Sequence, residues 1–141
     1  MISEHLQRVV LDAGPLIGLL YRSDEHHPAA VRGFRQLEES RTLLVVPLPI
    51  VFEVYKWLLQ RTNVRLARSG LQLMIERVET IYVSQGELAE AVNLTLARQD
   101  WLGSLEDAML AQTGIALSAP VWTFNYRDLT AFPSLQFWSP S

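Results

Sequence analysis

Four side chains stand where they could bind a metal ion: Asp12, Glu53, Asp107 and Asn125. Asp12 and Asn125 each follow an apolar run, so both are expected at the carboxyl end of a strand. Asp107 lies in the first turn of a predicted helix, and Glu53 lies within the apolar stripe of another. Sites in open parallel sheets form in the crevice beyond the carboxyl ends of the strands. The pattern therefore predicts that these side chains meet at one edge of a sheet.

Each of these residues also has a structural explanation. Asp12 could cap the helix that follows it, since Asp is a favoured N-cap residue. Glu53 could pair with an arginine, because a carboxylate in a buried stripe is costly unless it is paired or binds a cation. Asp107 stands at the third helical position of a capping-box pattern, and Asn125 and Asp128 could belong to a turn. The metal hypothesis rests on these residues taken together.

Oxygen-only ligands fit Mg²⁺ or Mn²⁺, hard cations that prefer carboxylates, water and substrate phosphate. The chemistry that follows is phosphodiester hydrolysis, in which the metal polarises a phosphoryl oxygen and activates a bound water. No histidine is expected to replace the metal as a base. His5 lies near the amino terminus, and His26 and His27 are expected to be solvated residues of a polar loop. The sequence also lacks the phosphate-binding glycine loops, the GxSxG elbow and the HExxH zinc motif.

Strand and helix patterns alternate along the chain. Apolar and β-branched runs predict strands at residues 8–11, 42–46, 79–83 and 120–124, with a further candidate at 135–138. Apolar residues at helical spacing predict helices at 16–21, 28–40, 50–61, 64–77 and 86–100, and a last helix that begins near 104. This order is typical of βαβ units. We therefore expect an α/β fold, a three-layer α/β/α sandwich with a mostly parallel central sheet of four to five strands.

Length and composition fit a single domain over residues 1–141, with 49% hydrophobic and 19% charged residues. The net charge of −3 means that RNA would have to bind a local basic patch. Arg61, Arg65, Arg68 and Arg127 are candidates for contact with RNA or a partner protein, because the arginine fork binds phosphate and carboxylate. No apolar run is long enough to span a membrane. The lack of cysteine favours a cytoplasmic protein.

Four segments of the sequence resemble PIN-domain proteins of the VapC-like toxin type. They read VVLDAGPLIGLL, LPIVFEVY, SLEDAMLAQTGIAL and VWTFNYRDL, and they occur in the family's order over almost the whole chain. The resemblance implies a compact α/β/α fold and Mg²⁺- or Mn²⁺-dependent cleavage of RNA. It also implies frequent homodimers and, often, an antitoxin protein encoded alongside.

Taken residue by residue, the resemblance puts Asp12, Glu53 and Asp107 on the family's acidic metal-site positions. The fourth acidic position follows a threonine at the end of a strand, and here it is Asn125. An amide oxygen can bind a metal ion or a metal-bound water, but it brings no negative charge. Asp128 could reach in from the turn instead. The main expectation is a metal-dependent endoribonuclease, the toxin of a toxin–antitoxin pair.

Two alternatives remain for the same residues. The first is a catalytically weakened PIN-like module that binds RNA or a partner protein, because Asn125 removes a charge and fewer charged ligands bind a metal less tightly. The second and weaker alternative is a phosphatase-like enzyme with Asp12 as its nucleophile. Gly14 stands where such an enzyme would carry a second acid.

Overall fold

The computed structural model describes residues 6–141. Its centre is a sheet of four strands in the order β3-β2-β1-β4, in which all neighbours are parallel. β1 (Arg8–Leu11) lies between β2 (Leu43–Pro47) and β4 (Val121–Trp122), and β3 (Glu79–Ile81) is the edge strand beyond β2. Because every strand runs in the same direction, all carboxyl ends meet at one edge of the sheet.

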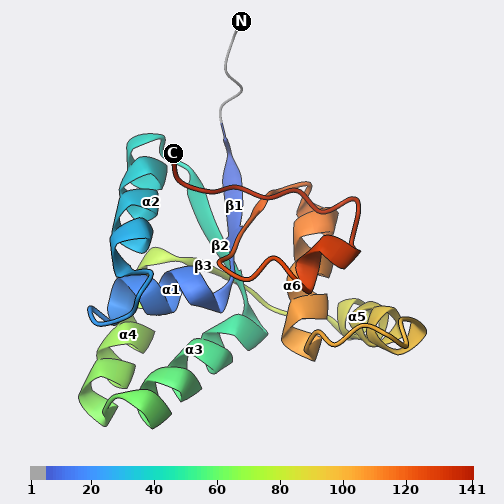
Figure 1. The fold of residues 1–141 in the computed structure, drawn as a ribbon, viewed down its shortest axis with the longest axis horizontal. Helices are drawn as coiled ribbons and strands as arrows, with labels where there is room; N and C mark the ends of the chain where they lie inside the picture. The colour runs from blue at the N-terminus through green and yellow to red at the C-terminus, as the bar shows by residue number, and fades with distance from the viewer. Residues whose placement is uncertain (1–5) are drawn as a thin grey trace, which may run out of the picture.

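Helices cover both faces of this sheet. Their bounds are α1 (Ala13–Leu20), α2 (His27–Glu39), α3 (Leu48–Arg61), α4 (Val64–Arg77), α5 (Gln85–Ala97) and α6 (Leu105–Leu117). Figure 1 shows α1 and α2 on one side of the strands and α5 and α6 on the other. The expected three-layer α/β/α sandwich with a parallel sheet is confirmed. Within residues 6–141, no helix is both long enough and apolar enough to cross a lipid bilayer.

The predicted elements differ from the structure mainly at their ends. β3 and β4 are shorter than predicted. β4 stops at Trp122 because the next residue, Thr123, accepts a hydrogen bond from the N–H of Asn125 at 2.9 Å, and this local bond starts a turn. The candidate fifth strand is only an isolated parallel bridge between Val121 and Phe137.

The core is built around Trp122, which is fully buried. Its ring packs against Phe34 of α2 and against Trp138, with centroids 4.8 and 5.1 Å away. Gly33 gives the ring its room: a Cβ atom there would lie 2.3 Å from Cη2 of Trp122. α2 can therefore approach the sheet closely only because it has no side chain at this position.

Gly33→Ala is expected to destabilise the chain by ~1–3 kcal/mol, because the new methyl group collides with a buried ring that has no space to move. In an open helical position the same change stabilises by ~0.5–1 kcal/mol. Gly86 of α5 is the matched control, since nothing lies within 4 Å of its Cβ position. Urea denaturation measures both changes, and a Gly33→Ala chain as stable as wild type would contradict this packing.

Candidate active site

Asp12 is held in place at the carboxyl end of β1 by hydrogen bonds from two elements. Its Oδ1 accepts from the N–H of Ala13, the first residue of α1, at 2.7 Å. Its Oδ2 accepts from the hydroxyl of Thr123, which follows β4, at 2.7 Å. Asp12 is thus the N-cap of α1, but capping does not use up the carboxylate. Each of its oxygens retains a lone pair, so the side chain can cap the helix and bind a cation together.

Thr123 is a site residue that the sequence analysis missed as such. It is 1% exposed, and it lies next to Asp12 because β4 pairs with β1 in parallel, with Leu11 opposite Trp122. Its hydroxyl both donates to Asp12 and accepts from the N–H of Asn125. The sequence shows a threonine at the end of a predicted strand. That this threonine contacts Asp12 follows only from the pairing of β4 with β1.

The start of α6 brings two more carboxylates to this edge. Ser104 and Asp107 form the complete capping box: Asp107 N–H donates to Ser104 Oγ at 3.1 Å, and Ser104 N–H donates to Asp107 Oδ2 at 2.9 Å. The structural explanation for Asp107 therefore holds, and it leaves Oδ1 for another ligand. Glu106 precedes Asp107 and was not among the predicted site residues. Its position in the acidic first turn of the helix was the available signal.

Glu53 of α3 faces acids and not bases. Within residues 6–141, the ion pairs are His26–Glu25 and Arg127–Asp128, so the arginine partner considered for Glu53 is not formed there. Burial is the largest cause, the charges of Asp12, Glu106 and Asp107 follow in that order, and together they raise the pKa of Glu53 to about 7. Glu53 is therefore a carboxyl group that titrates near neutral pH.

Burial also raises the pKa of Asp12. The hydrogen bonds from Thr123 and Ala13 favour the ionised form and oppose this rise, while the charge of Asp107 adds to it. Acids from β1, α3 and α6 thus disfavour one another's ionisation. A bound divalent cation would reverse this effect, because its charge is larger than that of any side chain nearby.

The chemistry of these donors fits Mg²⁺ or Mn²⁺, since all are carboxylate oxygens. Over residues 6–141, the side chains form no group of three or more acids or histidines that could hold one metal ion between them. Mg²⁺ does not require such a cage: it is usually bound by one or two carboxylates, with water and substrate phosphate as the other ligands. Asp12, which is buried and oriented, would be the first ligand, with Glu53 or Asp107 as the second.

The two candidates for the fourth position have different surroundings. Asn125 is exposed, and its backbone N–H donates to the hydroxyl of Thr123. The side chain of Asp128 is only 12% exposed, and its Oδ1 lies 3.6 Å from Nε of Arg127. The carbonyl oxygen of Asp128 accepts from the indole N–H of Trp101 at 2.8 Å. Asn125 is thus hydrogen-bonded to Thr123, which contacts Asp12, whereas Asp128 is paired with Arg127.

The four arginines predicted to contact RNA or a partner are all exposed. Arg61 ends α3, and Arg65 and Arg68 lie on α4. The guanidinium of Arg61 lies over the ring of Trp57, 5.5 Å from its centroid. These three arginines belong to the helical hairpin α3–α4, which projects from the sheet in Figure 1. Arg127 lies apart from them in the chain, after β4.

The prediction that His26 and His27 are solvated residues of a polar loop holds only in part: His26 lies in the loop with a side chain that is 42% exposed, but both rings make specific contacts and His27 belongs to α2. The ring of His26 stacks on Phe124, with centroids 4.4 Å apart and planes at 15°. His27 is the first residue of α2, and its Nδ1 lies 2.7 Å from the carbonyl oxygen of Gly18. The loop was read as solvated because Phe124, its partner, is far away in the sequence. His5 lies outside the described residues.

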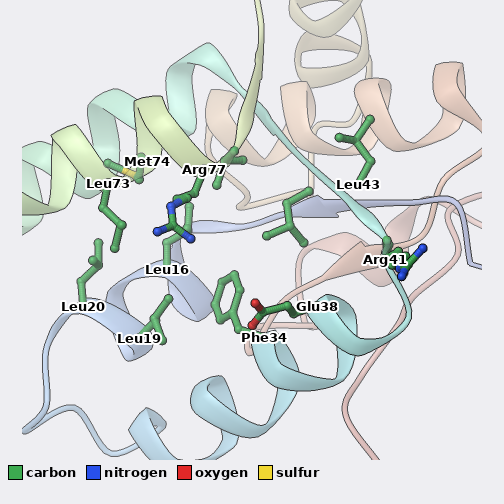
Figure 2. Close-up of a pocket in the computed structure, with 13 residues that line it drawn as sticks. Leu16, Leu19, Leu20, Phe34, Glu38, Arg41, Leu43, Leu73, Met74 and Arg77 are labelled. Carbon is green, nitrogen blue, oxygen red and sulfur yellow. The ribbon is translucent and has the colours of Figure 1, made fainter.

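Two apolar hollows lie beside these elements. The first, which we call the α1–α2–α4 groove, has a volume of about 500 Å³. Figure 2 shows Leu73 and Arg77 of α4 on one side of this groove and Phe34 of α2 on the other, with Glu38 beside Phe34. The second, which we call the α3–α6 hollow, has a volume of about 410 Å³. It is lined by Leu48, Pro49, Phe52, Val83, Leu88, Leu105, Glu106 and Met109.

No protein-family model and no curated protein matches the chain. Solved structures do match. The VapC20 toxin of Mycobacterium tuberculosis, described as cleaving the sarcin–ricin loop, is 15% identical, with a TM-score of 0.76 over 87% of this chain and 94% of that one. VapBC2 of Rickettsia felis, bound to a promoter DNA fragment, is 14% identical, with a TM-score of 0.74 over 94% and 98%. A toxin–antitoxin complex from Klebsiella pneumoniae is 20% identical, with a TM-score of 0.63 over 94% and 98%.

These similarities establish the fold. The chain has the architecture of the VapC-like PIN-domain toxins, and the resemblance read from the four sequence segments is confirmed at that level. The strand order β3-β2-β1-β4 and the acid that follows β1, Asp12, are observed in the structure of this chain itself.

Glu53→Gln is expected to stabilise the metal-free chain at alkaline pH. The pKa of Glu53 rises from 4.5 to about 7 on folding, so the folded state binds more protons in that interval. The contribution of the Glu53 carboxyl to the free energy of unfolding is therefore fully present below its pKa in the unfolded chain. This contribution is lost as the pH rises through its pKa in the folded chain. In thermal melts with chelator, the variant should exceed wild type at alkaline pH and approach it near the unfolded pKa. A difference that does not change with pH would contradict the raised pKa.

Proposed function

We propose that the chain is a metal-dependent endoribonuclease, the toxin of a toxin–antitoxin pair, which hydrolyses RNA phosphodiester bonds with Mg²⁺ or Mn²⁺ at Asp12. The observation that carries this proposal is the buried Asp12, oriented by two hydrogen bonds and facing carboxylates from α3 and α6. The charges of these acids repel one another, and a bound cation would offset that repulsion. VapC20, which is described as a sarcin–ricin loop cleaving toxin, shares the architecture.

The residues around Asp12 have distinct tasks in this proposal. Thr123 keeps the Asp12 carboxylate in one orientation, and Asp107 lies where it can serve as a further ligand. Glu53, with a pKa of about 7, gives up its proton when the cation binds, so metal binding releases protons. The metal, when bound, supplies an activated water and stabilises charge on the phosphoryl oxygens. Asn125, whose backbone N–H donates to Thr123, would offer an amide oxygen to such a water.

Arginines of the hairpin α3–α4 would hold the RNA backbone. Arg61, Arg65 and Arg68 are exposed and belong to the hairpin α3–α4. The acids would otherwise repel an RNA strand, and the chain as a whole is also negative. A local row of guanidinium groups offsets that repulsion, because phosphate contacts dominate nucleic-acid affinity.

A protein partner is part of the same proposal. The toxin–antitoxin complex from Klebsiella pneumoniae shares the fold, and the α1–α2–α4 groove offers a surface on which an antitoxin segment could bind. Its floor is aliphatic and aromatic, and Arg41 and Arg77 outnumber the single acid Glu38 at its rim. An amphipathic segment with apolar and acidic side chains matches this surface.

Asp12→Asn and Asp107→Asn are each expected to abolish metal-dependent RNA cleavage and to leave the fold intact. Each change removes a negative charge from the cation site and keeps the size of the side chain. Asp100→Asn, at an exposed acid after α5, is the matched control and should cleave like wild type. Gel analysis of RNA incubated with Mg²⁺ or Mn²⁺ measures this, with circular dichroism to verify folding.

Cleavage that survives both site variants would exclude this assignment. Asn125→Asp distinguishes the remaining alternative, a catalytically weakened module. If wild type does not cut RNA but Asn125→Asp does, the missing charge at this position is the defect. If neither chain cuts RNA at any metal concentration, the ribonuclease proposal fails.

We also propose that two copies of the chain associate through the α3–α6 hollow. Phe52 is 68% exposed there and Leu105 is 44% exposed, and large apolar side chains grouped on a surface mark interfaces. Phe52→Ser should therefore turn a dimer into a monomer in sedimentation experiments. Ile75→Ser, at a 59% exposed position on α4, is the control that should remain dimeric. A monomeric wild type across working concentrations would contradict the proposal.

A further inference from the structure

His26 presents an aromatic surface that the sequence analysis did not anticipate. Its ring lies nearly flat on Phe124, with centroids 4.4 Å apart and planes at 15°. Its side chain is nevertheless 42% exposed. Because Phe124 covers one face of the ring, this exposed area comes from the rest of the side chain.

This stack borders the candidate active site. Phe124 directly follows Thr123, whose hydroxyl donates to Oδ2 of Asp12 at 2.7 Å. The side chain of Phe124 also packs against the first turn of α1. Its Cδ2 lies 3.2 Å from the position that a Cβ atom of Gly14 would take. Phe124 is thus fixed by residues on both sides of Asp12. The ring of His26 forms a second layer over it.

The ring of His26 is not needed to end or start a helix. His26 is the N-cap residue of α2, where a side chain commonly accepts from a helical N–H, but it makes no such bond. The loop is held by other groups: the N–H of His26 donates to Oδ2 of Asp24 at 3.0 Å. His27 supplies the contact with Gly18. The placement of the His26 ring on Phe124 therefore has no evident capping role.

We propose that the exposed face of His26 is a stacking platform for a nucleobase of the RNA, next to the phosphate that is cleaved. This inference rests on the ribonuclease function proposed above. Unpaired bases in RNA stack on aromatic and histidine rings, and the platform lies beside the residues that orient Asp12. His26 is thus a positioning residue, which holds a nucleotide while the carboxylates act on its phosphate.

A base fits this surface better than a phosphate does. The carboxylate Oε1 of Glu25 lies 3.4 Å from Nε2 of His26, so the edge of the ring already faces a negative charge. A phosphate there would be repelled by Glu25, whereas the neutral face of a base would not. Stacking also attracts RNA without adding positive charge beside the acids that must bind the cation.

The test measures RNA binding in the Asp12→Asn chain, so that RNA is bound but not cut. The probe is a short fluorescent single-stranded RNA of randomised sequence, followed by anisotropy. In this background, His26→Gln keeps polarity but loses the ring, and is expected to bind about tenfold more weakly. His26→Tyr keeps a ring of suitable size and should bind like its parent. Oligo-A, oligo-U and oligo-C probes then show whether the loss depends on the base.

The outcomes separate this inference from the function on which it rests. If the parent binds RNA and His26→Gln binds equally well, the platform is excluded and the ribonuclease proposal stands. If His26→Tyr loses as much affinity as His26→Gln, a polar contact is responsible and stacking is excluded. A parent that binds none of the probes overturns the RNA substrate itself. Thermal melts check folding, and a lower melting temperature with unchanged RNA affinity would assign His26 a structural role only.

Discussion

The hydrogen bond from Thr123 to Asp12 is the contact on which the rest of the site depends. It joins the ends of two neighbouring parallel strands whose residues are far apart in the sequence. It also holds a carboxylate that is 8% exposed. A charged group so poorly hydrated is costly unless hydrogen bonds or a cation compensate it. The local geometry at this strand edge follows from that requirement: Ala13 and Thr123 donate to it, and the hydroxyl of Thr123 is itself held by Asn125.

Structural and chemical roles coincide in these residues. Asp12 caps α1 and Asp107 completes the capping box of α6, yet both also add negative charge around Glu53. Helix starts place carboxylates accurately, because backbone N–H groups fix their orientation. The starts of α1 and α6 therefore hold the carboxylate oxygens of Asp12 and Asp107 in fixed orientations. The cost is mutual repulsion, which adds to the effect of burial in raising the pKa of Glu53, and a divalent cation would relieve it.

Local pattern was enough to predict the architecture, because strands and helices alternate clearly and the strands are apolar on both faces. It also singled out Asp12, Glu53 and Asp107 as metal ligands, which stays a prediction. In the structure, burial raises the pKa of Glu53, and the charges of Asp12 and Asp107 add to that rise. The misses involve partners that only the fold brings together. Thr123 meets Asp12, Glu106 acts on Glu53, and the ring of His26 lies on Phe124. None of these pairs has a local signal, since each joins different elements.

The central claim is that the acids around Asp12 form a binding site for a divalent cation. Calorimetric titration of Mn²⁺ into wild type and into Asp12→Asn tests it most directly, with Asp100→Asn as a control for lost charge. The account predicts that wild type and the control bind Mn²⁺ and release protons, and that Asp12→Asn does not bind it. No binding by wild type at millimolar Mn²⁺, or equal binding by Asp12→Asn, would contradict it.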